Sequence, residues 1–369
     1  MRKYALSLVV VAVALVGAQP SLAQDRGSGV VFVQTNEPSG NKVAVFDRGA
    51  DGRLTLAGTY PTGGAGGVAA PGAESDHLAS QGSLVLSPDG KALIAVNAGS
   101  DTVTAFRVHG DRLQLRNVVA SGGQFPASVA VHDDLVYVLN SGGAGIVQGF
   151  RLRGDGLVPL AGSARTLGLA NSDPPNFLTS PGQVGFTPDG GKLLVTTKAS
   201  TNSIDVFNVG PDGLLSASPV VNPSATPVPF AFTFAPQGRL VSGEAGTSSV
   251  TTYAIAAGGT LTDPKSQSDG QAALCWIERV GDVYFVSNTA SNTLSSFAVD
   301  SSGQPTLLQA IAATTNPGPI DLTASGGFLY VETGTLSTVD EFAVNGDGTL
   351  TLLGSVTGLP PGIEGIAAS

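Results

Sequence analysis

The fold is decided by residues 84–108, which read LVLSPDGKALIAVNAGSDTVTAFRV. Two apolar runs flank an SPDG turn, and Asp-Gly between apolar runs is a strong signal for a β-hairpin. A polar NAGSD corner separates the second run, residues 92–96, from a third run at residues 102–108. The stretch therefore predicts three consecutive antiparallel strands.

This unit recurs along the whole chain, and an aromatic residue near the end of each third strand marks it. The steps between successive markers are 60, 44, 57, 46, 44 and 45 residues. A four-stranded unit repeated every ~40–50 residues is typical of a β-propeller. The seven markers predict seven blades and are Phe46, Phe106, Phe150, Phe207, Tyr253, Phe297 and Phe342.

The two ends of the repeat predict how the ring closes. Residues 30–34, 42–46 and 54–60 correspond to the second, third and fourth strands of a blade whose first strand is missing. Residues 362–366, GIEGI, match the pattern of a first strand. We expect this last strand to complete blade one, which removes two exposed sheet edges. The prediction is a single all-β domain over residues 24–369, a seven-bladed β-propeller of four-stranded antiparallel blades.

The N-terminal 23 residues have the features of a secretory signal peptide. Arg2 and Lys3 precede an apolar segment at residues 4–17, and Ser21-Leu22-Ala23 fits the small-x-small cleavage rule. The apolar segment is short for a membrane span. We therefore predict cleavage after Ala23 and a secreted or periplasmic protein, without membrane insertion. Cys275 is the only cysteine, so no intramolecular disulfide can form.

The composition limits the classes of partner. The 369 residues include 50 Gly and 23 Pro, carry a formal net charge of −10, and contain no Lys/Arg cluster in the body of the chain. This balance argues against nucleic acid and anionic membranes as partners. The three histidines have no metal-ligand spacing, and no cofactor-binding motif is present. We predict a monomer without metal or cofactor.

The predicted topology assigns every connection to one of two ends of the ring. The turns between strands one and two, and between strands three and four, share one end, which we call the bottom. The corners after strand two and the connections between blades share the other end, the top. Two insertions, residues 62–81 and 167–181, lengthen connections between blades. Both are therefore expected at the top, where propellers commonly bind ligands.

Most corners after strand two carry polar residues that ordinary turn chemistry explains. Asparagine tolerates the left-handed conformation and hydrogen-bonds its own turn. Lys198 and Glu244 do not fit that explanation. They align in neighbouring blades when counted back from the aromatic markers, so they form either a structural ion pair or a pair that handles a ligand. The aligned corner residues are Asn36, Asn97, Asn140, Lys198, Glu244, Asn288 and Thr333.

The repeat resembles the lactonase-type seven-bladed propeller family, which includes 6-phosphogluconolactonases and 3-carboxymuconate cyclases. The resemblance rests on SPDG at residues 87–90, AVNAGSDTVTAF at 95–106, YVLNSGG at 137–143, ALCW at 273–276 and DGTLTLLGS at 347–355. It is strongest to exported bacterial members. It implies a small lactone, sugar acid or carbohydrate as ligand at the channel mouth. The corner at residues 97–101 lacks the basic residues that enzyme relatives tend to carry there.

Two functions remain open from the sequence. The first is hydrolysis or isomerisation of a lactone, with Glu244 as general base and Lys198 stabilising the developing oxyanion. The alternative is a non-catalytic binding protein or scaffold of the cell envelope. A pocket shared by Lys198, Glu244 and Gln183 would favour the enzyme, and an apolar top containing Phe125, Phe230 and Trp276 would favour the binding protein. The expected ligand-binding residues are Gln183, Asn288, Asn97, Asn140, Gln81 and Trp276.

Overall fold

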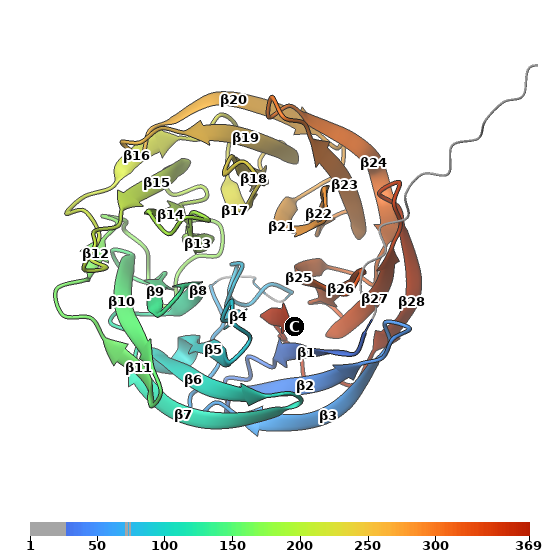
Figure 1. Ribbon diagram of the computed structural model, residues 1–369, viewed down its shortest axis with the longest axis horizontal. Helices are drawn as coiled ribbons and strands as arrows, with labels where there is room; N and C mark the ends of the chain where they lie inside the picture. Colours follow the sequence, from blue (N-terminus) through green and yellow to red (C-terminus); the bar gives the residue numbers. More distant parts are fainter. Residues whose placement is uncertain (1–26, 71–72, 74) are drawn as a thin grey trace, which may run out of the picture.

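The described chain forms a closed ring of seven β-sheets around a central axis (Figure 1). The computed structural model describes residues 27–70, 73 and 75–369. Each sheet is one antiparallel blade of four strands, and the third blade has an additional short strand beside β10. The described residues contain one 3-10 turn, η1 (Ala98–Ser100). The predicted seven-bladed all-β fold is confirmed, whereas the predicted signal peptide lies outside the described residues.

The strands follow one another from the axis outward in every blade. Blade one consists of β29 (Ile366–Ala368), β1 (Gly29–Gln34), β2 (Lys42–Arg48) and β3 (Leu54–Pro61). The other blades follow in chain order: β4 (Leu84–Leu86), β5 (Ala92–Asn97), β6 (Thr102–His109), β7 (Arg112–Ala120); β8 (Pro126–His132), β9 (Leu135–Asn140), β10 (Ile146–Arg153), β11 (Gly156–Pro159), with β12 (Arg165–Thr166); β13 (Gln183–Phe186), β14 (Lys192–Thr196), β15 (Ser203–Asn208), β16 (Val220–Pro223); β17 (Pro229–Phe234), β18 (Leu240–Glu244), β19 (Ser249–Ile255), β20 (Leu261–Ser268); β21 (Leu274–Val280), β22 (Val283–Asn288), β23 (Thr293–Val299), β24 (Pro305–Thr314); β25 (Pro319–Ser325), β26 (Phe328–Thr333), β27 (Thr338–Val344), β28 (Leu350–Val356).

The ring closes through the C-terminal strand, as the sequence predicts, but the strand is β29 (Ile366–Ala368) and begins at the last residue of the predicted segment 362–366. β29 pairs antiparallel with β1, with Ile366 opposite Val33 and Ala368 opposite Val31. Gln34 N donates a hydrogen bond of 2.8 Å to the carbonyl of Gly365, which extends the pairing toward the top. Blade one therefore combines the two ends of the described chain, and neither β29 nor β1 is left as an open edge.

The aromatic markers recur because each packs against the preceding blade. Phe150 of blade three belongs to one buried hydrophobic cluster with Val96 and Val103 of blade two, and Phe46 of blade one shares a cluster with Tyr330 of blade seven. The second and third strands are buried on both faces, since their neighbours in the ring cover them. The fourth strand alternates, with exposed positions facing outward, as in β3. Packing between blades thus selects one large apolar side chain per repeat.

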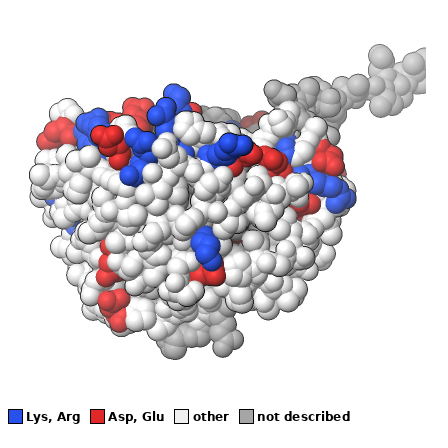
Figure 2. All heavy atoms as spheres, turned by 90° about the horizontal axis from the view of Figure 1, so that it is seen from below, with Lys and Arg blue, Asp and Glu red and all other residues white. Residues whose placement is uncertain are grey.

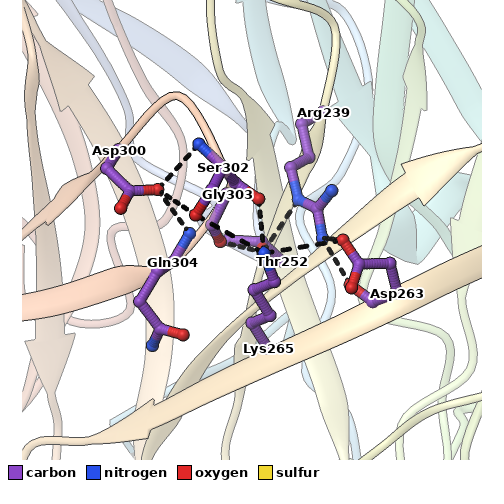
Figure 3. A network of polar contacts seen from close by, with 8 residues as sticks. All are labelled: Arg239, Thr252, Asp263, Lys265, Asp300, Ser302, Gly303 and Gln304. Carbon is purple, nitrogen blue, oxygen red and sulfur yellow. Dashed lines mark hydrogen bonds and ion pairs between the residues drawn. The ribbon is translucent and has the colours of Figure 1, made fainter.

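Charged residues gather at the bottom of the ring. Figure 2 shows Lys, Arg, Asp and Glu along one edge of the molecule, and most of the ion pairs belong to turns between strands three and four or one and two. Figure 3 shows one such network between blades five and six, in which Arg239 donates to Thr252 Oγ1 at 3.0 Å and pairs with Asp263 at 2.9 Å. Thr252 Oγ1 donates in turn to the carbonyl of Gly303 at 2.5 Å.

No helix in the described part of the chain is long and apolar enough to cross a membrane.

Candidate ligand site at the top of the ring

The end of the first insertion lies across the top of the central channel. Residues 78–82, which we call the plug, contact blades on opposite sides of the ring. Ser80 Oγ donates to the carbonyl of Ala127 in blade three at 2.8 Å, and its own carbonyl accepts from Trp276 Nε1 of blade six at 2.9 Å. In Figure 1 the chain leading into β4 occupies the middle of the ring. The plug therefore divides the space at the top from the channel below it.

Gln81 and Trp276, both predicted to bind ligand, are instead part of this closure. The Gln81 side-chain amide forms two hydrogen bonds to the backbone of Ile277, with Nε2 donating at 3.0 Å and Oε1 accepting at 3.1 Å. Trp276 is fully buried and packs on Phe230, with ring centroids 4.6 Å apart. Both side chains hold the plug to blade six.

The two insertions meet at the top, as their shared position in the topology predicts. Ala70 N donates to the carbonyl of Pro175 at 2.8 Å, and Phe177 N donates to the carbonyl of Ala70 at 3.1 Å. Lys198 joins the insertions from below. Its Nζ donates to the carbonyls of Ala79 and Phe177, each at 2.6 Å, and to Ser180 Oγ at 3.0 Å.

The Lys198 ammonium is a buried cation with all three protons in hydrogen bonds. Its side chain is 1% exposed, and Nζ lies 4.9 Å from the centroid of the Phe230 ring. Burial lowers the pKa of Lys198 to about 8, and the nearby Asp76 carboxylate opposes that shift. An ammonium has three donors, so a ligand oxygen that binds Nζ must replace one of the present partners.

Beside Lys198 is a pocket of about 350 Å³ between the insertions and blades five and six. Its walls are mainly apolar, and Asp76 and Lys198 are the charged residues among those that line it. Cys275 also lines it, and burial raises the pKa of that thiol to about 12, which keeps it protonated. The principal apolar lining residues are Phe177, Leu178, Val228, Phe230, Ala245 and Ala273.

Asp76 forms a coupled pair of carboxyls with Glu364. Burial raises the pKa of both, and the two acids interact directly. Hydrogen bonding between them lowers the pKa of Asp76 and raises that of Glu364, which favours Glu364 as the protonated member. Glu364 is in turn fixed by the plug, because Leu78 N donates to its Oε2 at 2.6 Å. Asp76 is therefore the group of the pair that carries negative charge beside Lys198.

The structure does not bring Glu244 to Lys198. The Glu244 carboxylate accepts hydrogen bonds from Ser224 Oγ and Tyr253 OH, each at 2.5 Å, from Thr251 Oγ1 at 2.6 Å, and from both Thr226 N and Thr226 Oγ1. Five donors occupy the lone pairs of the two oxygens. Glu244 is fully buried inside blade five and does not line the top pocket.

The alignment of Lys198 with Glu244 is wrong by one residue. Glu244 is paired with Ser249 across the corner, whereas in blade four Thr197 bonds Ser203 at the equivalent place. Lys198 follows as the first corner residue and takes a left-handed conformation, with φ of 47°. The corner of blade four is one residue longer than that of blade five, and counting back from the aromatic cannot detect the extra residue.

The predicted asparagines lie inside their own blades. Asn97 is fully buried, and its Nδ2 donates to Thr104 Oγ1 at 2.9 Å while its Oδ1 accepts from Thr62 Oγ1 at 2.6 Å. Asn140 donates to the carbonyl of Ser121 at 3.2 Å, and Asn288 donates to Ser295 Oγ at 2.7 Å. None of the three lines the top pocket. The corner conformation alone therefore does not explain these asparagines, because their side-chain amides also hydrogen-bond to the third strand and to the connection around strand four.

Gln183, the first residue of β13, does not line the top pocket. Its Oε1 accepts from Phe232 N of blade five at 2.6 Å, so it links two first strands. Asp76 was not recognised from the sequence, since a lone acid in a Gly/Ala-rich insertion has no motif. Only the contact between the insertions places it beside Lys198.

A comparison with protein families finds one match. Residues 21–155 match the family described as "Lactonase, 7-bladed beta-propeller". No curated protein matches the chain.

Solved structures share the ring over nearly the whole chain. A protein from Lactobacillus plantarum is 22% identical with a TM-score of 0.72, covering 93% of this chain and 99% of that one. The periplasmic gluconolactonase of Pseudomonas aeruginosa is 21% identical with a TM-score of 0.70, covering 91% and 98%. A provisionally named 6-phosphogluconolactonase from Bacteroides fragilis is 19% identical with a TM-score of 0.72, covering 95% and 100%. At these identities the likeness concerns the fold. The chain thus matches the lactonase-type seven-bladed β-propeller family over residues 21–155, and its closed ring has the seven-bladed fold of that family.

Proposed function

We propose that this protein binds a small, largely apolar lactone in the top pocket. The observation that carries the proposal is a pocket of about 350 Å³, walled by apolar side chains, with one ammonium and one carboxylate at its edge. Ligand pockets commonly have this size and this mixture of apolar walls and few polar groups. The family relationship supports a cyclic ester as the ligand class.

The lining favours an apolar lactone over a sugar acid or carbohydrate. A sugar ring needs a hydrogen-bond partner for most of its hydroxyls, because burying an unpaired hydroxyl costs about 1–3 kcal/mol. Phe177, Val228 and Phe230 offer none through their side chains. The lactone carbonyl would point toward Lys198, and its hydrocarbon part would contact Phe230. The predicted secreted or periplasmic location would give the protein access to such molecules outside the cytosol.

Calorimetry on the mature chain tests the binding role with two probes of similar size, γ-octalactone and glucono-δ-lactone. We expect saturable binding of γ-octalactone and at least tenfold weaker binding of glucono-δ-lactone. Ala245→Leu should fill the pocket and abolish binding, because Ala245 lines it. Ala272→Leu is the matched control, since Ala272 is exposed and does not line the pocket. Equal affinity of both variants and the parent would contradict the proposed site.

Lactone ring opening is the second candidate, and the juxtaposition of Asp76 with Lys198 favours it. Asp76 would accept a proton from the attacking water, and Lys198 would stabilise the developing oxyanion after exchanging its Ser180 contact for the substrate carbonyl. Glu244 has no comparable access to the pocket. This assignment keeps the ring-opening chemistry and the role of Lys198 predicted from the sequence, and it replaces Glu244 with Asp76 as the general base.

The catalytic candidate has a simple test. Titration at constant pH should show acid release from γ-octalactone by the parent, and Asp76→Asn should reduce the rate by ~10²–10⁴ while binding is retained. If the parent binds the lactone and releases no acid above the uncatalysed rate, the protein is a non-catalytic binding protein of the envelope, the alternative kept from the sequence.

A further inference from the structure

A second cavity lies in the channel below the plug. It measures about 430 Å³ and is lined by residues of the innermost strands β4, β8, β13, β21, β25 and β29. The lining reaches His132, Thr187 and Pro188, which belong to the bottom ends of β8 and β13 and the turn that follows. The cavity therefore faces the bottom of the ring, and Gln81 of the plug forms part of its lining toward the top. The function proposed for the top pocket does not use it.

Two carboxyls from neighbouring blades line this cavity without a compensating cation. Asp321 of β25 is 2% exposed, and its Oδ1 accepts from Leu322 N at 2.9 Å. The backbone N–H groups of Ile366 and Gly82 also lie close enough to lower the pKa of this carboxyl, but no donor among the described residues completes a hydrogen bond to Oδ2. Glu278 of β21 is partly buried, and no hydrogen bond or ion pair to its carboxyl is found among the described residues. No Lys or Arg is among the residues that line the cavity. A buried carboxyl oxygen without a donor, in a residue that lines a cavity, can be satisfied by a donor group of a ligand.

We propose that the lower channel binds a small organic cation, with the ammonium group of a linear amine placed between Glu278 and Asp321. Charge-assisted hydrogen bonds would satisfy the free carboxyl oxygens. The methylene groups of the amine would pack on the apolar part of the wall, which includes Val131, Val184 and Phe186.

An organic cation fits these walls better than a metal ion. No group of three or more His, Cys, Asp or Glu side chains in the described residues is arranged to hold a metal. Calcium and magnesium need about six or more oxygen ligands at short distance. Two carboxyls in a cavity of this volume leave space that a hydrocarbon chain can fill.

Binding of the cation should strengthen as the pH rises. Burial raises the pKa of Glu278 to about 8 and that of Asp321 to about 7, and the negative charge of Asp321 adds to the shift of Glu278. The other ionisable groups near them are Asp76, whose charge raises the pKa of Asp321, Glu332, whose pKa the charge of Asp321 raises, and His132 at the bottom rim. The cation binds the carboxyls in their ionised form. At low pH the carboxyls are protonated and must lose their protons before the cation binds, which weakens binding, whereas at high pH fewer protons have to leave.

Calorimetry with 1,4-diaminobutane in 0.15 M NaCl tests the proposal, with 1,4-butanediol as the uncharged probe. We expect saturable binding of the diamine whose affinity rises at least tenfold between pH 6 and pH 9, and no binding of the diol. Glu278→Gln and Asp321→Asn should each lower the affinity for the diamine at least tenfold. Asp282→Asn is the matched control, because the Asp282 side chain is 97% exposed at the bottom, outside the cavity.

Several results would overturn the proposal. The first is an absence of saturable diamine binding to the parent at pH 9, and the second is equal affinity for diol and diamine. The others are a loss of diamine affinity in Asp282→Asn equal to that in the two cavity variants, or binding of calcium in place of the diamine. The pH dependence of the parent is measured without any variant, so the proposal stays testable even if one substitution prevents folding. Failure of the γ-octalactone experiment would leave this result unaffected, because the two cavities are distinct.

Discussion

The two ends of the ring use opposite chemistry to hold their connections. At the bottom, partly or fully exposed Arg and Lys side chains pair with Asp residues of short turns, as Arg151 and Arg153 do with Asp134 at 2.6 and 2.5 Å. At the top, long connections are fixed by buried groups, among them Lys198, Asp76 and Glu364. Figure 2 shows how the charges gather along one edge.

This difference between the bottom and the top shows that the fold tolerates an unpaired charge where solvent reaches it and disfavours one that is buried. Solvent screens the pairs at the bottom, so each contributes little to stability and can vary. A buried charge at the top or in the channel is expensive unless every lone pair and proton is matched. The groups left unmatched, such as Asp321 Oδ2, are therefore the ones that point to a ligand.

The largest expected effect comes from removing residues 363–369, which serve the top and the ring closure together. Glu364 holds the plug, and β29 completes blade one. Ile363 and Ile366 are buried, and each should contribute about 1.5–3 kcal/mol. We expect aggregation or a fall in melting temperature of more than about 10 °C. Deleting Ser369 alone removes its hydrogen bonds with Val30 and should cost much less stability. Calorimetric melting of the longer deletion that matches the parent would contradict closure by β29.

Lys198→Met should act next most strongly and only at the top. It removes the donor to the carbonyl of Ala79, leaves the carbonyl of Phe177 with only the long hydrogen bond from Ser180 Oγ at 3.4 Å, and removes the positive charge near Asp76. Breaking a buried charged pair costs about 3–5 kcal/mol. Urea unfolding should show that loss, and hydrogen exchange should quicken at residues 75–81 and 176–180 and stay unchanged in the bottom turns. Uniform exchange across both ends would refute the view that Lys198 joins the insertions.

The pH dependence of stability should separate the channel from the bottom. Glu278 stays protonated in the folded protein up to its pKa of about 8, whereas in the unfolded chain it ionises above about pH 4.5. Stability should therefore fall as pH rises from about 4.5 to 8. Melting temperatures measured across this range should decrease in the parent and should decrease less in Glu278→Gln.

The bottom aspartates should respond in the opposite direction. Hydrogen bonds from Ser87 and Thr187 lower the pKa of Asp89 and Asp189 respectively, so their contribution is lost as pH falls through the folded-state pKa. Melting temperatures of Asp89→Asn and the parent should therefore converge in acid. A parent that is most stable above pH 8 would contradict the prediction for Glu278, and a difference in melting temperature between Asp89→Asn and the parent that does not shrink in acid would contradict the prediction for the bottom aspartates.

The smallest effect is expected from Arg151→Met at the bottom. Arg151 pairs with Asp134 and donates to the carbonyl of Asp212 at 2.7 Å in the next blade. The pair is partly exposed, so the loss should be about 1 kcal/mol or less and should shrink as NaCl is raised from 0.05 to 0.5 M. Urea unfolding at the two salt concentrations measures it. A large loss that is independent of salt would remove the contrast between the two ends.

The fold was largely predictable because its signals are local. The SPDG turns, the alternation of apolar residues and the one aromatic per repeat each depend on a strand and its neighbour. Closure by the last strand was predictable too, since the missing first strand of blade one left one segment to supply it. The corner of blade four shows the limit: a single added residue moved Lys198 out of register without disturbing the repeat.

The sequence alone thus determined the number of blades, the closure of the ring and the end that carries both insertions. Only the tertiary structure decided what those insertions do. Asp76, Phe177 and Lys198 are far apart in sequence and meet because two connections from different blades cross the same mouth. In the same way, Glu278 and Asp321 face one cavity because the ring brings their strands together at the axis. Such contacts depend on closure of the whole ring, so no spacing within one repeat can encode them.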